Sequence, residues 1–409
     1  MKANQERIEN HIKALSRYTA TPNEGTTRLT YSEEDLQARI YIKEQMEAYG
    51  LEVREDGLGN IFGKLEGEKK DAPSVIVGSH FDSVPHGGDY DGPAGVIAGL
   101  EIAALFQDNQ VKPVYPLEII AMIEEEGSRF GGGLMGSRGI AGYLSKDDVQ
   151  ETKDKDGISV PEAMKKIGLD PSLEVKRDPE TIKAFLEMHI EQGPILEEEQ
   201  ISVGVVESIV GLTQLEVTID GKAGHAGTTP MDRRSDALVA AANIISKLPQ
   251  IAMEEGEGTV TTVGRHQVFP NGANVIPDKV VFSVDIRSNK EAHVKNVVQK
   301  VKNLVRSWEA NGIQTAVEQS LYMQPKELNK KIRSILEASC AQLGTSFINM
   351  HSGAGHDAMV LSDITDVGLI FVPSKDGLSH CPEEWTAIHE LAAGIEVLYE
   401  TALKLTEKS

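Results

Sequence analysis

The chain has 409 residues, 40% of them hydrophobic and 25% charged, a composition that is ordinary for a globular protein and a length that favours two domains. The formal net charge of −22 argues against nucleic acid as a partner, because phosphate binding needs a basic surface. No apolar run is long enough for a membrane span, the charged N-terminus lacks a signal-peptide core, and only two cysteines occur, so we expect a cytoplasmic protein without a membrane partner.

The first part of the chain alternates helix and strand signals. Ser32 precedes a helix predicted over 33–50, with acidic residues in its first turn. Continuous apolar runs are typical of strands that are buried on both faces of a sheet. Such runs lie at 74–80, 116–124 and 183–190. The alternation predicts an α/β domain in which helices cover a mixed sheet.

The pattern changes near Gly211 and resumes after residue 323. In between, the predicted order of elements is βαββαβ, which is the order of a ferredoxin-like sandwich. Its strands are predicted at 212–221, 258–268, 279–288 and 313–322, and its helices at 233–248 and 290–312. The sequence therefore predicts an inserted α+β domain at 211–323 and a discontinuous first domain formed by 1–210 and 324–409.

Side chains that can bind metal follow the strand at 74–80, in the stretch GSHFDSVPHGGDYDGPAGV. His80 and Asp82 are two residues apart, so on an extended chain they point to the same side. Asp82 is placed to hold the second ring nitrogen of His80, and Asp91 could reach the same ion from a helix-entry turn. In α/β sheets, ligands bind beyond the carboxyl ends of the strands. Taken alone, one His–Asp pair is more often a capped turn.

Further polar side chains lie at other predicted strand ends. Adjacent carboxylates at such a position are costly unless a cation neutralises them or one is protonated, although an exposed acidic turn is the alternative. Two or more His with carboxylates suit Zn²⁺, Mn²⁺, Co²⁺ or Ni²⁺, and two-metal hydrolases share one carboxylate between their ions. The residues in question are Glu124, Glu125, Glu126, His189 and His380.

The sequence resembles the M20 metallopeptidase family over almost its whole length, from about residue 27 to Thr386. The motifs that carry the resemblance, in chain order, are GSHFDSVPHGGDYDGPAGV, EEEGSRF, HIEQGPILE, GHAGTTPM, NVIPDKVVFSVDIR, SGAGHDAM and FVPSKDGLSHCPEEW. They are most similar to the hydantoinase/carbamoylase branch, which holds N-carbamoyl-L-amino-acid hydrolases and allantoate amidohydrolases.

This resemblance implies a di-metal hydrolase domain with two divalent ions, each of them Zn²⁺, Mn²⁺, Co²⁺ or Ni²⁺. Asp91 matches the carboxylate that bridges the two ions. Glu125 matches the general base, and Asp82 matches the acid that supports the first His. The remaining ligands implied are His80 and His189 for one ion, and Glu126 and His380 for the other.

The resemblance also makes the inserted domain a lid and dimerisation domain that contacts the substrate. His225 matches the residue that stabilises the oxyanion, either within its own chain or across a homodimer, although it could also be part of a plain turn. Asn274 and Arg287 match residues that hold the substrate carboxylate, with a turn residue and a surface ion pair as the alternatives. Gln192 and the backbone near Gly355 match further substrate contacts.

The function implied is hydrolysis of a small ureido carboxylate, an N-carbamoyl-L-amino acid, to the L-amino acid, CO₂ and NH₃. The segments PEEWT and QGPILEEEQ favour this substrate. AMIEEEGSRF and MHSGAGHDAM also resemble allantoate amidohydrolases, which are the alternative. An aminoacylase or peptidase of the wider family, and a non-catalytic binding protein, are the remaining hypotheses.

Overall fold

The computed structural model describes residues 2–256, 258–309 and 312–407, which form two compact units. The first unit comprises the residues up to Glu207, Leu328–Met350 and the residues from His356 onward. The second comprises Ser208–Glu327 and His351–Gly355. Residues 1, 257, 310–311 and 408–409 lie outside the described residues; they include two positions of the helix predicted at 290–312 and both ends of the predicted first domain.

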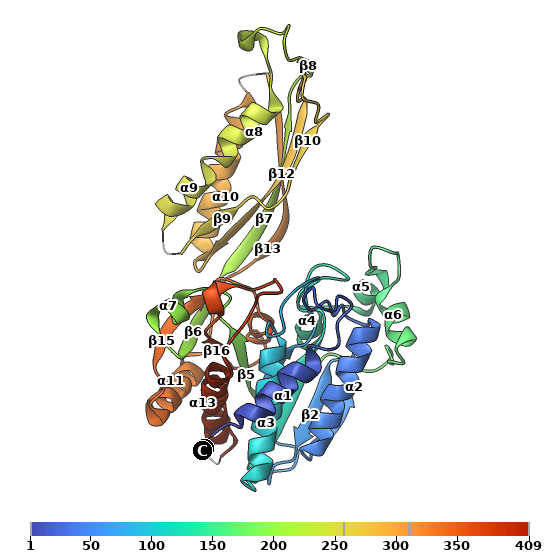
Figure 1. Ribbon diagram of the computed structural model, residues 1–409, viewed down its shortest axis with the longest axis vertical. Helices are drawn as coiled ribbons and strands as arrows, with labels where there is room; N and C mark the ends of the chain where they lie inside the picture. Colours follow the sequence, from blue (N-terminus) through green and yellow to red (C-terminus); the bar gives the residue numbers. More distant parts are fainter. Residues whose placement is uncertain (1, 257, 310–311, 408–409) are drawn as a thin grey trace. The chain divides into compact units, whose positions relative to one another are not determined.

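In the described part of the chain, the main sheet has nine strands in the order β1-β2-β4-β3-β5-β16-β6-β14, with β15 paired to β6. Figure 1 labels β2, β5, β6, β15 and β16 of this sheet. Neighbours β4, β3, β5 and β16 run parallel, so their carboxyl ends meet at one edge, and the predicted mixed α/β sheet is confirmed. The strands are β1 (Glu52–Glu55), β2 (Ile61–Leu65), β3 (Ser74–His80), β4 (Leu117–Met122), β5 (Ile182–Ile190), β6 (Val203–Ile209), β14 (Lys326–Glu327), β15 (Phe347–Ser352) and β16 (Val367–Val372).

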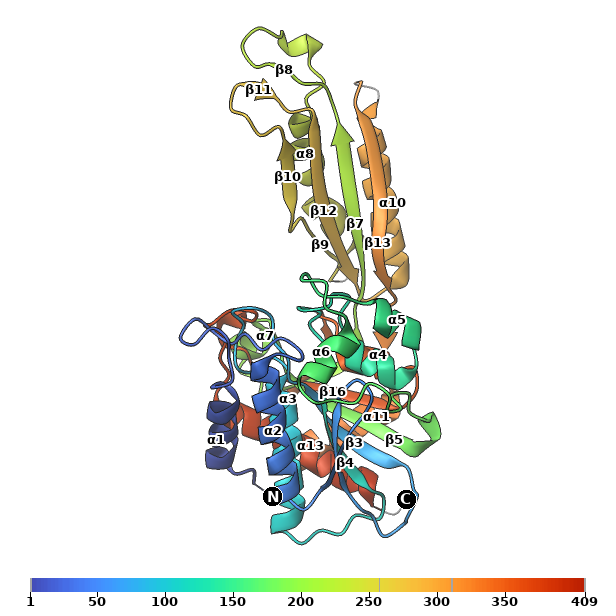
Figure 2. The ribbon, with the colours of Figure 1, turned by 90° about the vertical axis from the view of Figure 1, so that its right-hand side faces the viewer.

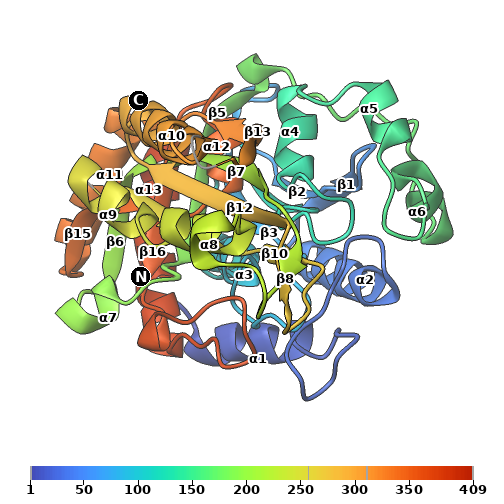
Figure 3. The ribbon, with the colours of Figure 1, turned by 90° about the horizontal axis from the view of Figure 1, so that it is seen from above.

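Helices cover this sheet, and α3 approaches it most closely. Side chains at Gly95 and Gly99 of α3 would meet atoms of β5 and β4, so glycine permits the contact. α1 and α13 pack against α3, α2 lies along β1 and β2, and α5 and α6 pack side by side at the periphery (Figure 3). The helices are α1 (Gln5–Leu15), α2 (Glu33–Ala48), α3 (Pro93–Asp108), α4 (Met135–Ala141), α5 (Lys146–Glu151), α6 (Val160–Lys166), α7 (Ile195–Glu199), α11 (Lys330–Leu343), α12 (Asp357–Leu361) and α13 (Ile388–Thr406). Among the described residues, no helix has the length and apolar character needed to cross a bilayer.

The second unit is an antiparallel sheet in the order β10-β12-β7-β13, with β9 beside β12 and a separate β8–β11 pair (Figure 2). Alternate residues of β7 and β12 are buried, because one face of the sheet packs on α8 and α10. This face and the helices form a core of their own. The elements are β7 (Gly211–Asp220), β8 (Gly224–His225), α8 (Ala237–Ile245), α9 (Leu248–Glu255), β9 (Val260–Thr262), β10 (His266–Phe269), β11 (Val275–Ile276), β12 (Lys279–Ser288), α10 (Glu291–Arg306) and β13 (Gln314–Met323).

Candidate active site

Two buried histidines lie at the carboxyl ends of adjacent parallel strands. His80 is the last residue of β3, and His189 is the penultimate residue of β5. The Nδ1 of His189 lies 2.9 Å from the carbonyl oxygen of Ile190, and the Nδ1 of His80 lies 3.2 Å from that of Asp82. Since a carbonyl oxygen only accepts, each Nδ1 carries a proton, and in the neutral ring each Nε2 then presents a free lone pair.

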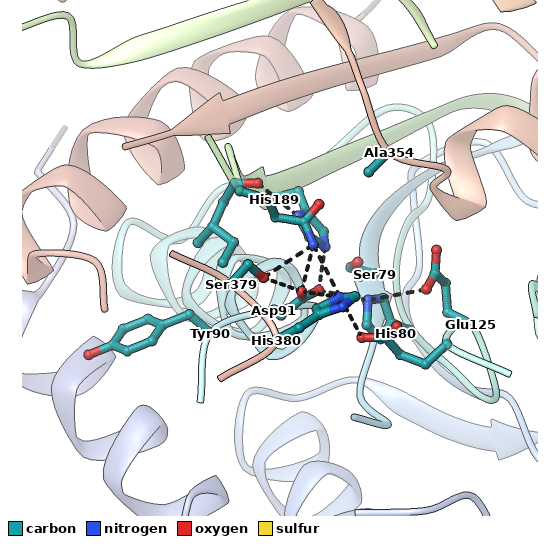
Figure 4. Close-up of polar contacts among 12 residues, drawn as sticks. Ser79, His80, Tyr90, Asp91, Glu125, His189, Ala354, Ser379 and His380 are labelled. Carbon is teal, nitrogen blue, oxygen red and sulfur yellow. Dashed lines mark hydrogen bonds and ion pairs between the residues drawn. The ribbon is translucent and has the colours of Figure 1, made fainter. Parts of the chain in front are cut away.

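Asp91 lies at the centre of the site, in the turn that leads into α3 (Figure 4). Its Oδ1 lies 3.1 Å from the Nε2 of His189 and 3.5 Å from the Nε2 of His80. Its Oδ2 lies 3.1 Å from the Nε2 of His380, which follows β16 in a loop. The two oxygens of one carboxylate thus face two separate sets of imidazoles.

The acidic turn after β4 completes the site. Asp82 holds this turn, because its two carboxylate oxygens accept hydrogen bonds from the backbone N–H groups of Glu125 (3.1 Å) and Glu126 (3.3 Å). An oxygen of Asp82 also lies 3.5 Å from the Nδ1 of His80. The Oε2 of Glu125 lies 3.9 Å from the Nε2 of His80, and the Oε1 of Glu126 lies 3.4 Å from the Nε2 of His380. Asp82 therefore orders the Glu125–Glu126 turn as well as facing His80.

Carboxylates crowd together with the imidazoles at the carboxyl ends of these strands, and this shifts the pKa values of several of them. Burial, and then repulsion by nearby carboxylates, raises the pKa of Glu125 well above its usual range, although His80 opposes this effect. Burial, and then Asp91, raises the pKa of Glu126 to about 7. Burial alone would raise the pKa of Asp91, but His189 and the other imidazoles around it hold that pKa well below its usual range. Bound cations would relieve the repulsion among these acids.

The residues at the site fit divalent cations. Three groups of potential ligand atoms, each group within 4.8 Å, share members with one another. Among the described residues, the Oε1 atoms of Glu126 and Gln192 are buried without a hydrogen-bond partner. A set of imidazole nitrogens and carboxylate oxygens suits Zn²⁺, Mn²⁺, Co²⁺ or Ni²⁺. The groups are His80–Asp91–His189, Asp91–Glu126–His380 and His80–Glu125–Glu126.

Three polar residues around Asp91 have roles that the sequence did not reveal. The Nε2 of Gln192 donates a 2.6 Å hydrogen bond to the Oδ2 of Asp91, so this residue, predicted as a substrate contact, also supports a potential ligand. The Oγ of Ser379 donates to the same oxygen at 2.7 Å. The buried Glu384 accepts hydrogen bonds from both loops that carry Asp91 and His380. The only sequence signal for the last two was their proximity to His380.

His225, predicted to stabilise the oxyanion, and Asn274, predicted to bind the substrate, lie together in the second unit. His225 on β8 is paired with Val275, and the carbonyl oxygen of Asn274 accepts a hydrogen bond from the backbone N–H of Ala226. The Nδ1 of the exposed His225 accepts hydrogen bonds from two backbone N–H groups of its own loop. In the neutral ring, Nε2 therefore carries the proton and can donate it to a ligand.

Arg287 lies near the other end of the same unit. Its guanidinium is held by the carboxylate of Asp285 at 2.8 Å and donates to the carbonyl oxygen of Gly353, two residues before Gly355. Asn274 precedes β12, which starts at Lys279. Arg287 lies eight residues further along this extended strand, a span of about 26 Å from Lys279. A small substrate therefore cannot contact both Asn274 and Arg287 of the same chain.

Comparisons with known proteins agree with the sequence motifs. The model of peptidase family M20/M25/M40 matches residues 76–404. An N-carbamoyl-L-amino-acid amidohydrolase of Paenarthrobacter aurescens is 42% identical over 97% of both chains. An allantoate amidohydrolase of Escherichia coli (strain K12) is 37% identical over 96% of this chain and 95% of its own. The crystal structure of a hydantoinase/carbamoylase family amidase from Burkholderia multivorans has a TM-score of 0.94 and 33% identity, covering 100% of this chain and 99% of that one. The chain therefore belongs to peptidase family M20/M25/M40 and matches its hydantoinase/carbamoylase branch, as the motifs predicted.

Proposed function

We propose that the protein hydrolyses the ureido C–N bond of N-carbamoyl-L-amino acids. One water enters, and the L-amino acid, CO₂ and NH₃ leave. The observation that carries the reaction class is the position of Asp91, whose two oxygens face separate imidazole sets. The substrate class is supported by the name of the Paenarthrobacter aurescens relative, which is 42% identical over nearly the whole chain.

In this proposal, Asp91 holds both of two divalent cations. His80 and His189 complete one group, and Glu126 and His380 complete the other. When bound, the cations supply polarisation of the ureido carbonyl and make the attacking water more acidic. A ureido carbonyl is a poor electrophile, so the reaction needs this assistance.

The proton transfers fall to Glu125. Its carboxylate lies beside the site, 3.9 Å from the Nε2 of His80, and its backbone is fixed by Asp82. Glu125 takes a proton from the attacking water and delivers it to the leaving nitrogen, as a general base and then a general acid. The protonated Nε2 of His225 donates a hydrogen bond to the oxyanion that forms on the carbonyl oxygen.

We further propose that the second unit acts as a lid and a dimerisation domain. The planar fork of Arg287, held by Asp285, suits the carboxylate of the amino acid. The span of about 26 Å along β12 supports a homodimer in which Arg287 of one chain and His225 and Asn274 of the other serve one substrate. Arg287 of one chain and the His225–Asn274 pair of the same chain then serve different sites of the dimer.

Ammonia release tests the function. The enzyme is treated with a chelator, restored with Mn²⁺ or Co²⁺, and given N-carbamoyl-L-methionine, with N-carbamoyl-D-methionine as the control substrate. We expect metal-dependent release from the L-substrate that is lost in the Glu125→Gln variant. Absence of release from the L-substrate by metal-loaded enzyme would contradict the proposal.

Allantoate is the second candidate substrate, because the Escherichia coli relative of that name is 37% identical over 96% of this chain. Allantoate also carries a ureido group and a carboxylate, so the same residues would act on it. Steady-state rates on both substrates separate the two functions. A higher kcat/KM for allantoate would keep the chemistry and reassign the substrate.

A further inference from the structure

One buried carboxylate outside the potential ligands contacts the backbone of two of them. The side chain of Glu384 has two oxygens, and each has two polar partners. The Oε1 accepts from the backbone N–H groups of Tyr90 (2.9 Å) and Asp91 (3.0 Å). The Oε2 accepts from the backbone N–H of His380 (3.3 Å) and lies 2.9 Å from the Oγ of Ser379, whose single proton is shared between Glu384 and Asp91. Glu384 is only 4% exposed, so these bonds satisfy a carboxyl group that is shielded from water.

Glu384 joins two loops that are far apart in sequence. The N–H of Asp91 lies 293 residues from it, whereas that of His380 lies four residues away. The loop before α3 closes tightly on the carboxylate, because a Cβ at Gly88 would overlap it. Ser379 completes the junction, since its Oγ contacts Glu384 and also the Oδ2 of Asp91.

His380 depends on this junction more than the other histidines do. The side chains of His80 and His189 are buried within the sheet edge, but that of His380 is 49% exposed. Its backbone has a φ of +58°, a left-handed conformation that a residue other than glycine keeps only when its surroundings hold it. Side-chain packing therefore contributes little to the position of this imidazole, and the hydrogen bond from its N–H to Glu384 contributes directly.

We propose that Glu384 is a positioning residue that fixes Asp91 and His380 relative to each other and thereby sets the affinity of the Asp91–Glu126–His380 group for its cation. The inference rests on the proposed two-cation site. A carboxylate is required, because its two oxygens accept backbone N–H groups from two different loops. An amide has one carbonyl oxygen, and its NH₂ would face a backbone N–H donor on the other side.

The test measures cation binding directly. Metal-free wild type and Glu384→Gln are equilibrated with graded Mn²⁺, and bound metal per chain is measured by elemental analysis. We expect the wild type to bind two equivalents and Glu384→Gln to bind one of them about 10–100-fold more weakly, the usual effect of losing a partner that orients a ligand. Activity of the variant should recover as Mn²⁺ is raised by the same factor, which a simple loss of folded protein would not produce.

Three further variants make the result specific. Glu383→Gln is the matched control, because this neighbour is exposed, and it should bind both cations as the wild type does. In a His380→Ala background, Glu384→Gln should weaken cation binding less than it does in the wild type, because one of the two ligands that it positions is already removed. If Glu384→Gln does not fold, Ser379→Ala removes one arm of the junction and should weaken the same cation.

Two results would overturn the inference, and they are distinguishable. Wild-type affinity for both cations in Glu384→Gln and Ser379→Ala, or an undiminished effect of Glu384→Gln in the His380→Ala background, would exclude the positioning role and leave the two-cation site intact. A wild-type chain that binds fewer than two cations would instead remove the site itself.

Discussion

Replacement of Asp82 by Asn should lower kcat/KM while the cation held by His80 and His189 stays bound. The two oxygens of Asp82 accept the N–H groups of Glu125 and Glu126, and an amide can accept only one of them. A hydrogen bond to a charged group contributes about 1.5–3 kcal/mol, and about 1.4 kcal/mol corresponds to a factor of ten. Loss of one such bond therefore predicts a fall of about 10–100-fold in kcat/KM. The carbonyl oxygen of Asp82, which the substitution keeps, lies nearer to His80 than its carboxylate does.

The assay combines kcat/KM for ammonia release with bound metal per chain in Asp82→Asn. Asp147→Asn, an exposed change of the same kind on α5, is the control and should be silent. The expected result is a lower rate while the cation held by His80 and His189 is retained. Loss of the cation held by His80 and His189, with the rate restored fully by added metal, would refute the reasoning and give Asp82 the role of a support for His80 alone.

The other predictions concern the second unit and the N-terminal helix. If His225 acts across a dimer, co-expression of His225→Ala with Glu125→Gln, each inactive alone, should restore about one quarter of the wild-type activity; no restoration would place His225 in its own chain's site. Asp285→Asn should raise KM more than it lowers kcat, because Asp285 orients the guanidinium of Arg287; an unchanged KM would contradict this. Burial lowers the pKa of His11 from 6.5 to about 4, so the unfolded chain takes up the proton first as the pH falls. The free energy of unfolding should drop by up to about 3 kcal/mol between pH 6.5 and 4 in the wild type relative to His11→Gln, measured by denaturant titration; equal pH profiles would contradict this.

The sequence was informative where burial and strand direction decide the structure. The apolar runs at 74–80 and 183–190 are strands, and they run parallel. The side chains at their carboxyl ends therefore had to meet at one edge. That is why His80 and His189 could be placed near each other before the structure was known.

The sequence was silent where a loop decides which of two similar residues is buried. Glu383 and Glu384 are adjacent acids in PEEW, but only Glu384 is enclosed, because a loop almost 300 residues earlier closes on it at Gly88. A sequence motif also does not tell how far apart two residues lie in the folded domain. Asn274 and Arg287 were expected to share a substrate carboxylate, but Asn274 precedes β12 and Arg287 lies near its end, so the length of the strand separates them.

The central claim is that Asp91 serves both cations, and metal analysis of Asp91→Ala beside His380→Ala tests it most directly. We expect two equivalents of Mn²⁺ in the wild type, one in His380→Ala, and neither tightly bound cation nor ammonia release in Asp91→Ala. Retention of both cations by Asp91→Ala, or loss of both in His380→Ala, would contradict the account.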